Sequence, residues 1–540
     1  MVVENSKLLD AYCLLDIQNL NVSIHNTKIL ENVSFCLNEG EIFGVVGESG
    51  SGKSMTALSL MRLLPEGAKI TGSAIFSKTD LLKISEDKMC TFRGNAIGMI
   101  FQEPMTALNP VQTIGNQVAE TLIIHGKAKR AEALKIAREK LNRVGLTEEQ
   151  FPLDKYPHEL SGGQRQRVAI ALAIAMRPKI LIADEPTTAL DVTTQSQILK
   201  LLKSLVEEEK MALILITHDL AVVSGLADNV AVMQTGKIVE AGTTNNVFNE
   251  MKHSYTQQLF SASNHTPVRN SKLEEIPLLE IKNVVRNYKL PRESIFAHPK
   301  FFPAVRDISF TLRKGENLGL VGESGCGKST LTRAILGLEE LQGGEIKLEG
   351  DIVKAGKKLN SKIRRKMQVV FQDPFGSFNP RHKIGRLISE PFYLMQNKPT
   401  GVQLKSEIDD ALINVGLKEE DADKYIHEFS GGQRQRIAIA RALIIKPSLI
   451  VLDEAVSALD VSIRAQVLDL LAELSSKFNL SYLFISHDLS VVRNITDRVL
   501  VMKSGKIVES GETQKVFDNP QHEYTKELIA ATPKLPKHLS

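Results

Sequence analysis

Residues 160–191 read LSGGQRQRVAIALAIAMRPKILIADEPTTALD, and residues 429–460 read FSGGQRQRIAIARALIIKPSLIVLDEAVSALD. The two stretches are identical at 17 of 32 positions and lie 269 residues apart, so the chain contains an internal repeat. Each copy begins with a glycine-rich turn, continues in a helical pattern and ends in a short apolar run followed by two carboxylates. The simplest division of the 540 residues is therefore two similar domains of about 260 residues each.

The composition is that of a globular protein. Hydrophobic residues make up 43% of the chain and charged residues 24%, and no apolar run approaches the roughly 18 to 20 residues of a membrane-spanning helix. The net charge of +4 is spread along the chain, which favours an ordinary solvated surface over a nucleic-acid-binding face. The first residues, MVVENSKLLD, lack the pattern of a secretory signal. Any membrane role must therefore come through a partner.

The four cysteines are widely spaced along the chain. Cys13, Cys36, Cys90 and Cys326 lie too far apart for a zinc or iron–sulfur spacing. We therefore expect four reduced thiols, as is usual in the cytosol.

A polar segment separates the two halves. Residues 261–277, SASNHTPVRNSKLEEIP, are polar and contain two prolines, which is typical of a linker. We therefore predict a first domain over 1–262, a linker over 263–277 and a second domain over 278–540. Each half ends on a related sequence, HSYTQQL (253–259) and HEYTKEL (522–528). The second half carries about 11 extra residues within KLPRESIFAHPKFFPAV (289–305), which we expect to form a surface loop.

A glycine-rich loop lies near the start of each half. GESGSGKS (47–54) and GESGCGKS (322–329) both fit G-x-x-x-x-G-K-[ST] after an apolar strand and before a helical pattern. Glycines allow successive backbone N–H groups to turn towards phosphate oxygens, the helix N-terminus adds positive potential, and the lysine and serine serve phosphate and Mg²⁺. One such match is also compatible with an ordinary glycine turn. Two matches in the same context predict two phosphate-binding loops.

Adjacent carboxylates follow a buried strand in each half. The strands end at Asp184 and Glu185, and at Asp453 and Glu454. Side chains alternate along a strand, so neighbouring carboxylates point in different directions and can serve different purposes. We expect one of each pair to serve Mg²⁺ and the next to act on water.

Glutamine and histidine recur at matched positions after two other strands. Gln102 and Gln372 lie 270 residues apart, and His218 and His487 each follow their strand aspartate by 34 residues. A single glutamine or histidine at a strand end is more often a surface or structural residue. The recurrence favours a functional role for both pairs.

Ser161 and Ser430 precede the long helix of the repeat. They occupy the position of an N-cap residue, and Gly-Gly follows each of them. A single Ser-Gly-Gly favours an ordinary capped helix. Beside phosphate-loop motifs, the same helix N-terminus also offers donors and a positive dipole to an anion.

With these motifs in place, the chain resembles the ATP-binding subunits of ATP-binding cassette transporters along essentially its whole length. The resemblance rests on Walker A, the Q-loop glutamines, the LSGGQ-type signatures at 160–164 and 429–433, Walker B, the D-loops at 189–191 and 458–460, and the switch histidines. FQEP and FQDP, SGGQRQR and the terminal H-x-Y-T sequences are similar to the peptide/nickel importer group. The implied fold is α/β, with two tandem P-loop NTPase domains that each contain a RecA-like core, an antiparallel β subdomain and a helical subdomain.

The resemblance implies a role for individual residues. The catalytic residues would be Glu185, Glu454, His218 and His487, and Mg²⁺ would be bound by Ser54, Gln102, Asp184, Ser329, Gln372 and Asp453. ATP would be bound by Gly47, Ser49, Gly50, Gly52, Lys53, Ser54, Met55, Gln102, Tyr288, Gly322, Ser324, Gly325, Gly327, Lys328, Ser329, Thr330 and Gln372, and by the signature residues Ser161, Gly162, Gly163, Gln164, Ser430, Gly431, Gly432 and Gln433. The two cassettes would associate head to tail within the chain, so that each ATP is closed by the signature of the other half.

The resemblance also implies partners and a location. We expect ATP and Mg²⁺ as ligands, two transmembrane permease subunits and an extracytoplasmic solute-binding protein as partners, and a peripheral position on the cytoplasmic face of the bacterial inner membrane. A four-cysteine segment that follows H-x-Y-T in many members of the wider group is missing, so we predict no iron–sulfur cluster. We expect no nucleic-acid partner.

Two departures from the family pattern separate the halves. Tyr288 fits the aromatic residue that stacks on adenine, whereas its counterpart in the first half is Ile24. We therefore expect the first site to bind ATP more weakly, by about 0.5 to 1.5 kcal/mol. Ala455 replaces Pro186 after the second Walker B, but Glu454 is retained, so we expect two active sites.

Two other twin-cassette classes were weighed. A ribosome-acting translation factor typically carries a long charged helical linker, which this polar linker cannot supply. A DNA-repair or chromosome protein would require long insertions or zinc-binding cysteines, which this sequence lacks. The importer ATPase is the favoured prediction, and the solute remains open among peptides, glutathione, microcin-like peptides and nickel.

Overall fold

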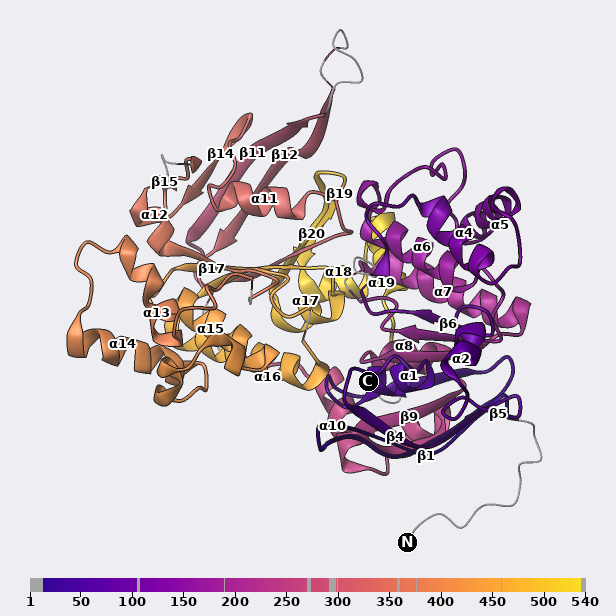
Figure 1. The fold of residues 1–540 in the computed structure, drawn as a ribbon. Coiled ribbons are helices and arrows are strands. Elements are labelled where there is room, and N and C mark those ends of the chain that lie inside the picture. The colour runs from indigo at the N-terminus through magenta and orange to yellow at the C-terminus, as the bar shows by residue number, and fades with distance from the viewer. Residues whose placement is uncertain are drawn as a thin grey trace. The chain divides into compact units, whose positions relative to one another are not determined.

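The computed structural model describes residues 13–103, 107–188, 190–269, 273–290, 298, 300–356, 360–374, 376–457 and 459–535. The chain divides into two compact units, one formed mainly by residues before His265 and one mainly by His265–Thr532. Each unit contains an antiparallel sheet, a mixed sheet and a group of helices (Figure 1). No helix among the described residues is both long enough and apolar enough to cross a membrane.

The first unit is built on a four-stranded and a six-stranded sheet, with strand orders β2-β1-β4-β5 and β10-β9-β3-β8-β7-β6. The strands are β1 (Leu15–Ile24), β2 (Thr27–Leu37), β3 (Ile42–Val46), β4 (Ala68–Phe76), β5 (Thr79–Asp80), β6 (Ile97–Ile100), β7 (Ile180–Asp184), β8 (Ala212–Thr217), β9 (Asn229–Gln234) and β10 (Lys237–Thr243). The helices are α1 (Lys53–Leu60), α2 (Glu86–Phe92), α4 (Ile114–Ile124), α5 (Arg130–Arg143), α6 (Gly162–Ala173), α7 (Val192–Glu209), α8 (Leu220–Leu226), α9 (Thr244–Glu250) and α10 (Ser254–Ser263), with the short 3₁₀ helix η1 (Pro157–Glu159).

The second unit repeats this arrangement, with strand orders β12-β11-β14-β15 and β16-β17-β18-β13-β19-β20. The strands are β11 (Pro277–Lys289), β12 (Phe301–Arg313), β13 (Asn317–Val321), β14 (Gly343–Leu348), β15 (Asp351–Ile352), β16 (Met367–Val370), β17 (Leu449–Asp453), β18 (Ser481–Ser486), β19 (Arg498–Lys503) and β20 (Lys506–Glu512). The helices are α11 (Lys328–Ile335), α12 (Ser361–Lys366), α13 (Ile384–Ser389), α14 (Gly401–Asn414), α15 (Gly431–Leu443), α16 (Val461–Phe478), α17 (Leu489–Ile495), α18 (Thr513–Asp518) and α19 (Glu523–Ala531), with 3₁₀ helices η3 (Glu390–Leu394), η4 (Glu419–Asp423) and η5 (Ile426–Glu428).

The central strands of both mixed sheets are parallel and completely buried. Every residue of β3 and β8 is buried, and so is every residue of β13 and β18. A strand that is covered on both faces has a continuous run of apolar residues in its sequence. Such runs allow these strands to be predicted from the sequence. The helices α4, α5 and α6 pack on one another in the first unit, as α13, α14 and α15 do in the second (Figure 1). The predicted architecture of core, β subdomain and helical subdomain is confirmed in each unit.

Cys13 and Cys36 form a disulfide bridge, which corrects the expectation of four reduced thiols. Antiparallel pairing of β1 with β2 brings the start of one strand opposite the end of the other, and the two Cα atoms lie 5.8 Å apart. The two cysteines are 23 positions apart in the sequence, and spacing alone could not predict this proximity, because it depends on how the two strands pair. Cys90 and Cys326 are free thiols.

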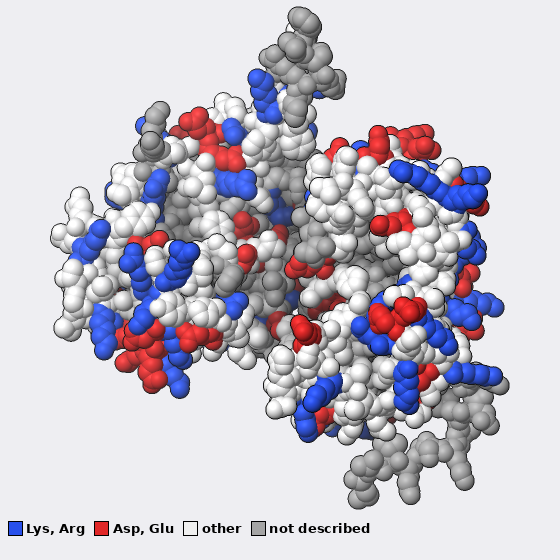
Figure 2. Space-filling view, viewed as in Figure 1, with Lys and Arg blue, Asp and Glu red and all other residues white. Residues whose placement is uncertain are grey.

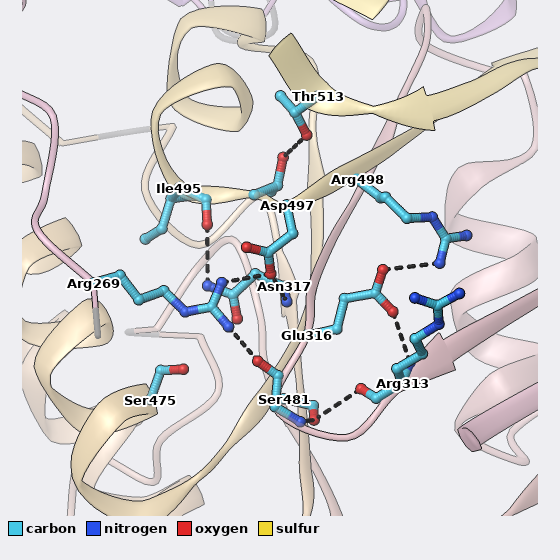
Figure 3. Close-up of polar contacts among 12 residues, drawn as sticks. Arg269, Arg313, Glu316, Asn317, Ser475, Ser481, Ile495, Asp497, Arg498 and Thr513 are labelled. Carbon is cyan, nitrogen blue, oxygen red and sulfur yellow. Dashed lines mark hydrogen bonds and ion pairs between the residues drawn. The ribbon is translucent and has the colours of Figure 1, made fainter. Parts of the chain in front are cut away.

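Two residues of the predicted linker, His265 and Arg269, bind the second unit through ion pairs. Arg269 Nη1 lies 2.5 Å from Asp497 Oδ2, and Arg269 also donates to the carbonyl of Gly315 (Figure 3). His265 Nε2 lies 2.6 Å from Asp469 Oδ1 on α16. Part of the predicted linker therefore belongs to the fold of the second unit. Residues 270–272 lie outside the described residues, as do 291–297 and 299 in the predicted surface loop.

Charges of both signs are mixed over the face of the molecule in view (Figure 2). Lysine and arginine side chains do not gather there into one continuous basic surface. On that face the distribution agrees with the interpretation of the net charge as an ordinary solvated surface.

Candidate nucleotide-binding sites

The phosphate-loop motif connects β3 to α1 in the first unit and β13 to α11 in the second. Gly52 and Gly327 precede the helices with φ of 101° and 112°, a conformation that glycine adopts readily. A Cβ atom at Gly47 would lie 2.3 Å from the carbonyl oxygen of Met233, and one at Gly322 would lie equally close to that of Met502. Glycine is therefore required where the loop passes the neighbouring strand.

The lysine of each loop points back into the loop that carries it. Lys53 Nζ donates to the carbonyl oxygens of Gly47 at 2.8 Å and Glu48 at 2.9 Å. Lys328 Nζ makes the matching bonds to Gly322 at 2.6 Å and Glu323 at 2.9 Å. Both lysines are 5% exposed. A buried ammonium group within such a loop is well placed to bind a phosphate. The phosphate oxygens can replace the loop carbonyls as hydrogen-bond acceptors of the lysine.

Asp184 is turned towards the phosphate-loop helix. Ser54 Oγ donates to Asp184 Oδ1 at 3.1 Å, which joins the end of β7 to the first turn of α1. Burial raises the pKa of Asp184 to about 6, although the Ser54 hydrogen bond acts in the opposite direction. A hydroxyl and a carboxylate beside a phosphate loop are the oxygen ligands that Mg²⁺ takes together with phosphate oxygens. These residues therefore fit a Mg²⁺–nucleotide complex.

Glu185 turns away from Asp184 to a different set of partners. His218 Nδ1 lies 3.3 Å from Glu185 Oε1, and Glu185 Oε2 accepts from Gln102 Nε2 at 3.0 Å and Thr188 Oγ1 at 2.9 Å. Burial acts to raise the pKa of Glu185, but the hydrogen bond and charge of His218 outweigh it and lower the pKa to about 2. The two carboxylates point to different partners, as expected, but Glu185 lies after the end of β7 and strand alternation is not the cause.

A left-handed backbone conformation produces this turn. Glu185 has φ of 47° and Glu454 has φ of 52°, values that are uncommon for a residue with a side chain. The amide of Glu185 donates to the carbonyl of Ile216 at 2.9 Å, and that of Glu454 donates to Ile485 at 2.8 Å. The neighbouring strand thus holds both glutamates in a strained conformation, which is a frequent feature of functional sites.

The second unit contains the same carboxylate pair with fewer contacts. His487 Nδ1 lies 3.2 Å from Glu454 Oε1, and this contact lowers the pKa of Glu454 against the effect of burial. Burial raises the pKa of Asp453. Within the described part of the chain, no hydrogen bond joins Gln372 to Glu454 or Ser329 to Asp453. The carboxylate network is therefore more extensive in the first unit.

The signature sequences form capped helix starts, as predicted. Ser161 Oγ accepts from the amide of Gln164 at 3.3 Å, and Gln164 Oε1 accepts from the amide of Ser161 at 2.9 Å. Ser430 and Gln433 form the same reciprocal pair at 3.4 and 3.0 Å. This is a capping box, and it orders the N-termini of α6 and α15. The D-loop positions 189 and 458 lie outside the described residues.

Tyr288 lies in a polar cluster beside the phosphate-loop helix of the second unit. Its hydroxyl donates to Glu339 at 2.6 Å and lies 3.4 Å from Thr330 Oγ1, and the guanidinium of Arg286 lies 4.8 Å from the ring centroid. Arg286 Nε also donates to Glu339 at 2.9 Å. We call Arg286, Tyr288 and Glu339 the tyrosine clamp. The carboxylate and the guanidinium together fix the orientation of the ring.

The first unit replaces the whole tyrosine clamp by apolar residues. The strand pairing equates Arg286 with Val22 and Tyr288 with Ile24, because β1 and β11 differ by 264 residues while β2 and β12 differ by 275. The phosphate-loop offset of 275 equates Glu339 with Leu64. The difference between the halves therefore extends beyond the single aromatic residue that the sequence singled out.

The predicted site residues form two groups in each unit. Around one phosphate loop the first unit assembles Gly47, Ser49, Gly50, Gly52, Lys53, Ser54, Met55, Gln102, Asp184, Glu185 and His218, and its signature begins α6. Around the other loop the second unit places Gly322, Ser324, Gly325, Gly327, Lys328, Ser329, Thr330, Tyr288, Asp453, Glu454 and His487, and its signature begins α15. Gln372 is exposed at the end of β16.

Sequence reasoning missed two contributors. Thr188 binds the predicted catalytic glutamate, and the contrast between EPTTALD and EAVSALD marks its position. Glu339 holds Tyr288, and its only sequence signal is an acidic residue shortly after the phosphate-loop helix. Neither residue lies in a motif that identifies its partner.

Comparison with known proteins places these motifs in a family. A family model described as ABC transporter matches residues 30–188 and 305–457, and one described as oligopeptide/dipeptide transporter, C-terminal region, matches residues 239–284 and 508–540. The chain is 45% identical to the glutathione import ATP-binding protein GsiA of Escherichia coli (strain K12), over 98% of this chain and 91% of that protein. The protein of the same name from Salmonella choleraesuis (strain SC-B67) is 44% identical over the same shares. A solved dimer of the ATP-binding cassette MJ0796 bound to ADP and phosphate is 31% identical, covers 43% of this chain and 98% of its own, and has a TM-score of 0.39.

Proposed function

The chain belongs to the ABC transporter family, and from that membership we propose that it is the ATPase subunit of an importer for peptides or peptide-like solutes. The observation that carries the proposal is the combination of two complete cassettes with two copies of the oligopeptide/dipeptide transporter C-terminal region in one chain. The 45% identity to a glutathione import ATP-binding protein supports a small peptide-like solute.

Each ATP site is composed of residues from both cassettes. Site one combines Lys53, Ser54, Asp184, Glu185 and His218 with the signature Ser430–Gln433 of the second cassette. Site two combines Lys328, Ser329, Asp453, Glu454 and His487 with Ser161–Gln164 of the first. The capped signature helices present backbone N–H groups that suit a phosphate from the opposite side.

Hydrolysis then depends on positioning and charge. Lys53 and Lys328 exchange their loop carbonyls for phosphate oxygens, and Glu185 and Glu454 orient and polarise the attacking water. His218 and His487 hold the glutamates in place. Ser54 with Asp184, and Ser329 with Asp453, would hold Mg²⁺ together with Gln102 and Gln372, and the ion would neutralise phosphate charge.

The membrane partners follow from the same proposal. Two transmembrane permease subunits carry the solute, and an extracytoplasmic solute-binding protein delivers it. The chain itself lies at the cytoplasmic face of the inner membrane, where closing and reopening of the two cassettes drives the permease. The solute does not contact this chain, so its identity is decided by the other subunits.

Reconstitution tests this function. The chain is co-purified with its two membrane subunits, placed in liposomes with the solute-binding protein, and assayed for ATP turnover with peptides, glutathione, microcin-like peptide or Ni²⁺. We expect a peptide-like solute to raise turnover, and the Lys53→Ala, Lys328→Ala variant to show none. Stimulation by Ni²⁺ alone would correct the solute class. Stimulation by ribosomes with none by any solute would replace the importer by a translation factor.

A further inference from the structure

The H-x-Y-T sequence at the end of each half begins a helix, α10 or α19. His253 Nδ1 accepts from the amide of Tyr255 at 3.2 Å, and His522 Nδ1 accepts from that of Tyr524 at 3.1 Å. Each histidine is therefore the N-cap of its helix. The first residue of the motif thus fixes where the helix begins, and with it the position of the tyrosine.

A glutamate on the last strand of each mixed sheet holds the turn before this helix. Glu240 on β10 accepts from the amides of Lys252 at 2.9 Å and His253 at 3.1 Å, and from Thr256 Oγ1 at 2.6 Å. Glu509 on β20 accepts from the amides of Gln521 at 2.8 Å and His522 at 3.1 Å. The backbone amide of the histidine therefore anchors the helix start to the sheet in both units, and the threonine hydroxyl does so in the first.

The tyrosine between them reaches the phosphate loop. The amide of Glu48 donates to Tyr255 Oη at 3.1 Å, and the amide of Glu323 donates to Tyr524 Oη at 3.0 Å. Glu48 and Glu323 are the second residues of the two phosphate loops. Tyr255 is 5% exposed and Tyr524 is 2% exposed, so each of these amides has a buried partner about 200 residues along the chain.

The same residues, Glu48 and Glu323, are also bound by the phosphate-loop lysines. Lys53 donates to the carbonyl of Glu48, and Lys328 donates to that of Glu323, both at 2.9 Å. The second residue of each loop is therefore held at its N–H by the tyrosine and at its C=O by the lysine. When the lysine turns to a phosphate, the tyrosine bond remains, and a buried N–H without an acceptor would be costly.

We propose that Tyr255 and Tyr524 are positioning residues that hold the phosphate loops in their binding conformation from the side of the oligopeptide/dipeptide transporter C-terminal region. The role rests on the proposed ATP-binding function of the loops. The identical contact in two copies that differ at many other positions argues against chance, and it gives the H-x-Y-T sequence a purpose in nucleotide binding. The histidine caps the helix, and in the first cassette the threonine binds the helix start to the sheet. The tyrosine hydroxyl binds the phosphate loop.

The test is Tyr255→Phe with Tyr524→Phe in the full-length chain. Phenylalanine keeps the buried ring and removes the acceptor, so we expect the Kd for Mg-ATP to rise about three- to thirtyfold while the melting temperature falls by only a few degrees. Tyr482→Phe is the matched control, because Tyr482 is fully buried and its hydroxyl has no hydrogen-bond partner among the described residues. Unchanged affinity in the double variant, or an equal loss in the control, would overturn the proposal.

Two further measurements separate this role from packing and from the proposed function. Hydrogen exchange of the segments Gly47–Ser54 and Gly322–Ser329 is expected to become faster in the double variant and to stay unchanged in the control. Unchanged exchange would contradict the proposal even if affinity fell. Lys53→Ala with Lys328→Ala tests the ATP sites themselves: if that variant loses ATP while the tyrosine variants bind normally, only the positioning role fails.

Discussion

Asp184 and Glu185 are neighbours in the chain, yet their pKa values move in opposite directions. Burial raises the pKa of Asp184 to about 6. At Glu185 burial also acts to raise the pKa, but the hydrogen bond and charge of His218, with the Thr188 hydrogen bond and the charge of Lys53, outweigh it and lower the pKa to about 2. The backbone turn at φ of 47° separates the two carboxyl groups. Asp184 thus contacts a serine, and Glu185 contacts histidine, threonine and glutamine side chains.

Replacing both water-facing glutamates tests their role. Glu185→Gln with Glu454→Gln keeps side-chain shape but removes the negative charge that polarises water, so we expect Mg-ATP to bind and turnover to fall at least about a hundredfold. Turnover is measured by phosphate release and binding by equilibrium dialysis. Glu149→Gln with Glu420→Gln, two exposed positions, is the control and should retain full activity. Undiminished turnover in the first variant would remove both glutamates from catalysis.

At the scale of single residues, much of the site could be predicted because repetition exposes it. Asp184, Glu185 and His218 recur in the second half at one constant offset, and Lys53 recurs within a second phosphate-loop motif. Thr188 was not assigned because it does not recur in the second half, where Ser457 stands at the matching position. Glu339 was not assigned because its contact with Tyr288, a residue far from it in the sequence, depends on how the chain folds. The disulfide of Cys13 with Cys36 was missed for the same reason.

The strand β11, which carries Arg286 and Tyr288 of the tyrosine clamp, differs from its counterpart β1 in the first cassette. Val22, Ile24 and Leu64 replace the polar clamp in the first cassette. Because an aromatic platform adds about 0.5 to 1.5 kcal/mol to a stacking contact, we expect Tyr288→Ala to weaken ATP binding at site two about two- to tenfold. Titration with a fluorescent ATP analogue resolves the two sites. Unchanged affinity at both would show that Tyr288 does not bear on the nucleotide.

The clamp also predicts a dependence of stability on pH. Although burial acts to raise it, the hydrogen bonds of Tyr288 and Arg286 lower the pKa of Glu339 below its usual 4.5. A carboxyl group with a lowered folded-state pKa stabilises the fold above its unfolded pKa, and this contribution disappears as the pH falls through the folded-state pKa. We therefore expect Glu339→Gln to cost about 1 to 2 kcal/mol at pH 7 and much less below pH 4.5.

Urea unfolding of the wild type and Glu339→Gln at several pH values measures this difference. The matched control is Glu340→Gln, which removes the neighbouring exposed carboxylate. A difference that stays constant from pH 7 to pH 4 would contradict the ionic role of Glu339. A larger difference at low pH would reverse the predicted sign.

For the whole molecule, the sequence could predict two tandem α/β cassettes because the repeat, the strand patterns and the phosphate loops agree. The contacts of the linker could not be predicted from the sequence. Its composition indicated only a polar connection, whereas Arg269 binds Asp497 of the second cassette (Figure 3). His265 binds Asp469 of the same cassette. A polar segment that pairs with a folded surface has the same composition as one that does not.

The linker contact makes a prediction about stability. Arg269 is 12% exposed and bonds both a carboxylate and a backbone carbonyl, so Arg269→Ala should destabilise the second cassette by about 1 to 3 kcal/mol. Arg381→Ala, at an exposed position of the same cassette, is the control. Urea unfolding followed by limited proteolysis reports which cassette opens first. Equal stability of the two variants would show that the linker contributes nothing to the fold.

The central claim is that each ATP site draws its phosphate loop from one cassette and its signature from the other. The most direct measurement is the affinity for radiolabelled Mg-ATP in a Lys53→Ala background, where the phosphate loop of Lys328 is the remaining site. The account predicts that Ser161→Ala weakens this binding about tenfold and that Ser430→Ala, which removes the same kind of helix cap, leaves it unchanged. Weakening by Ser430→Ala with no effect of Ser161→Ala would contradict it.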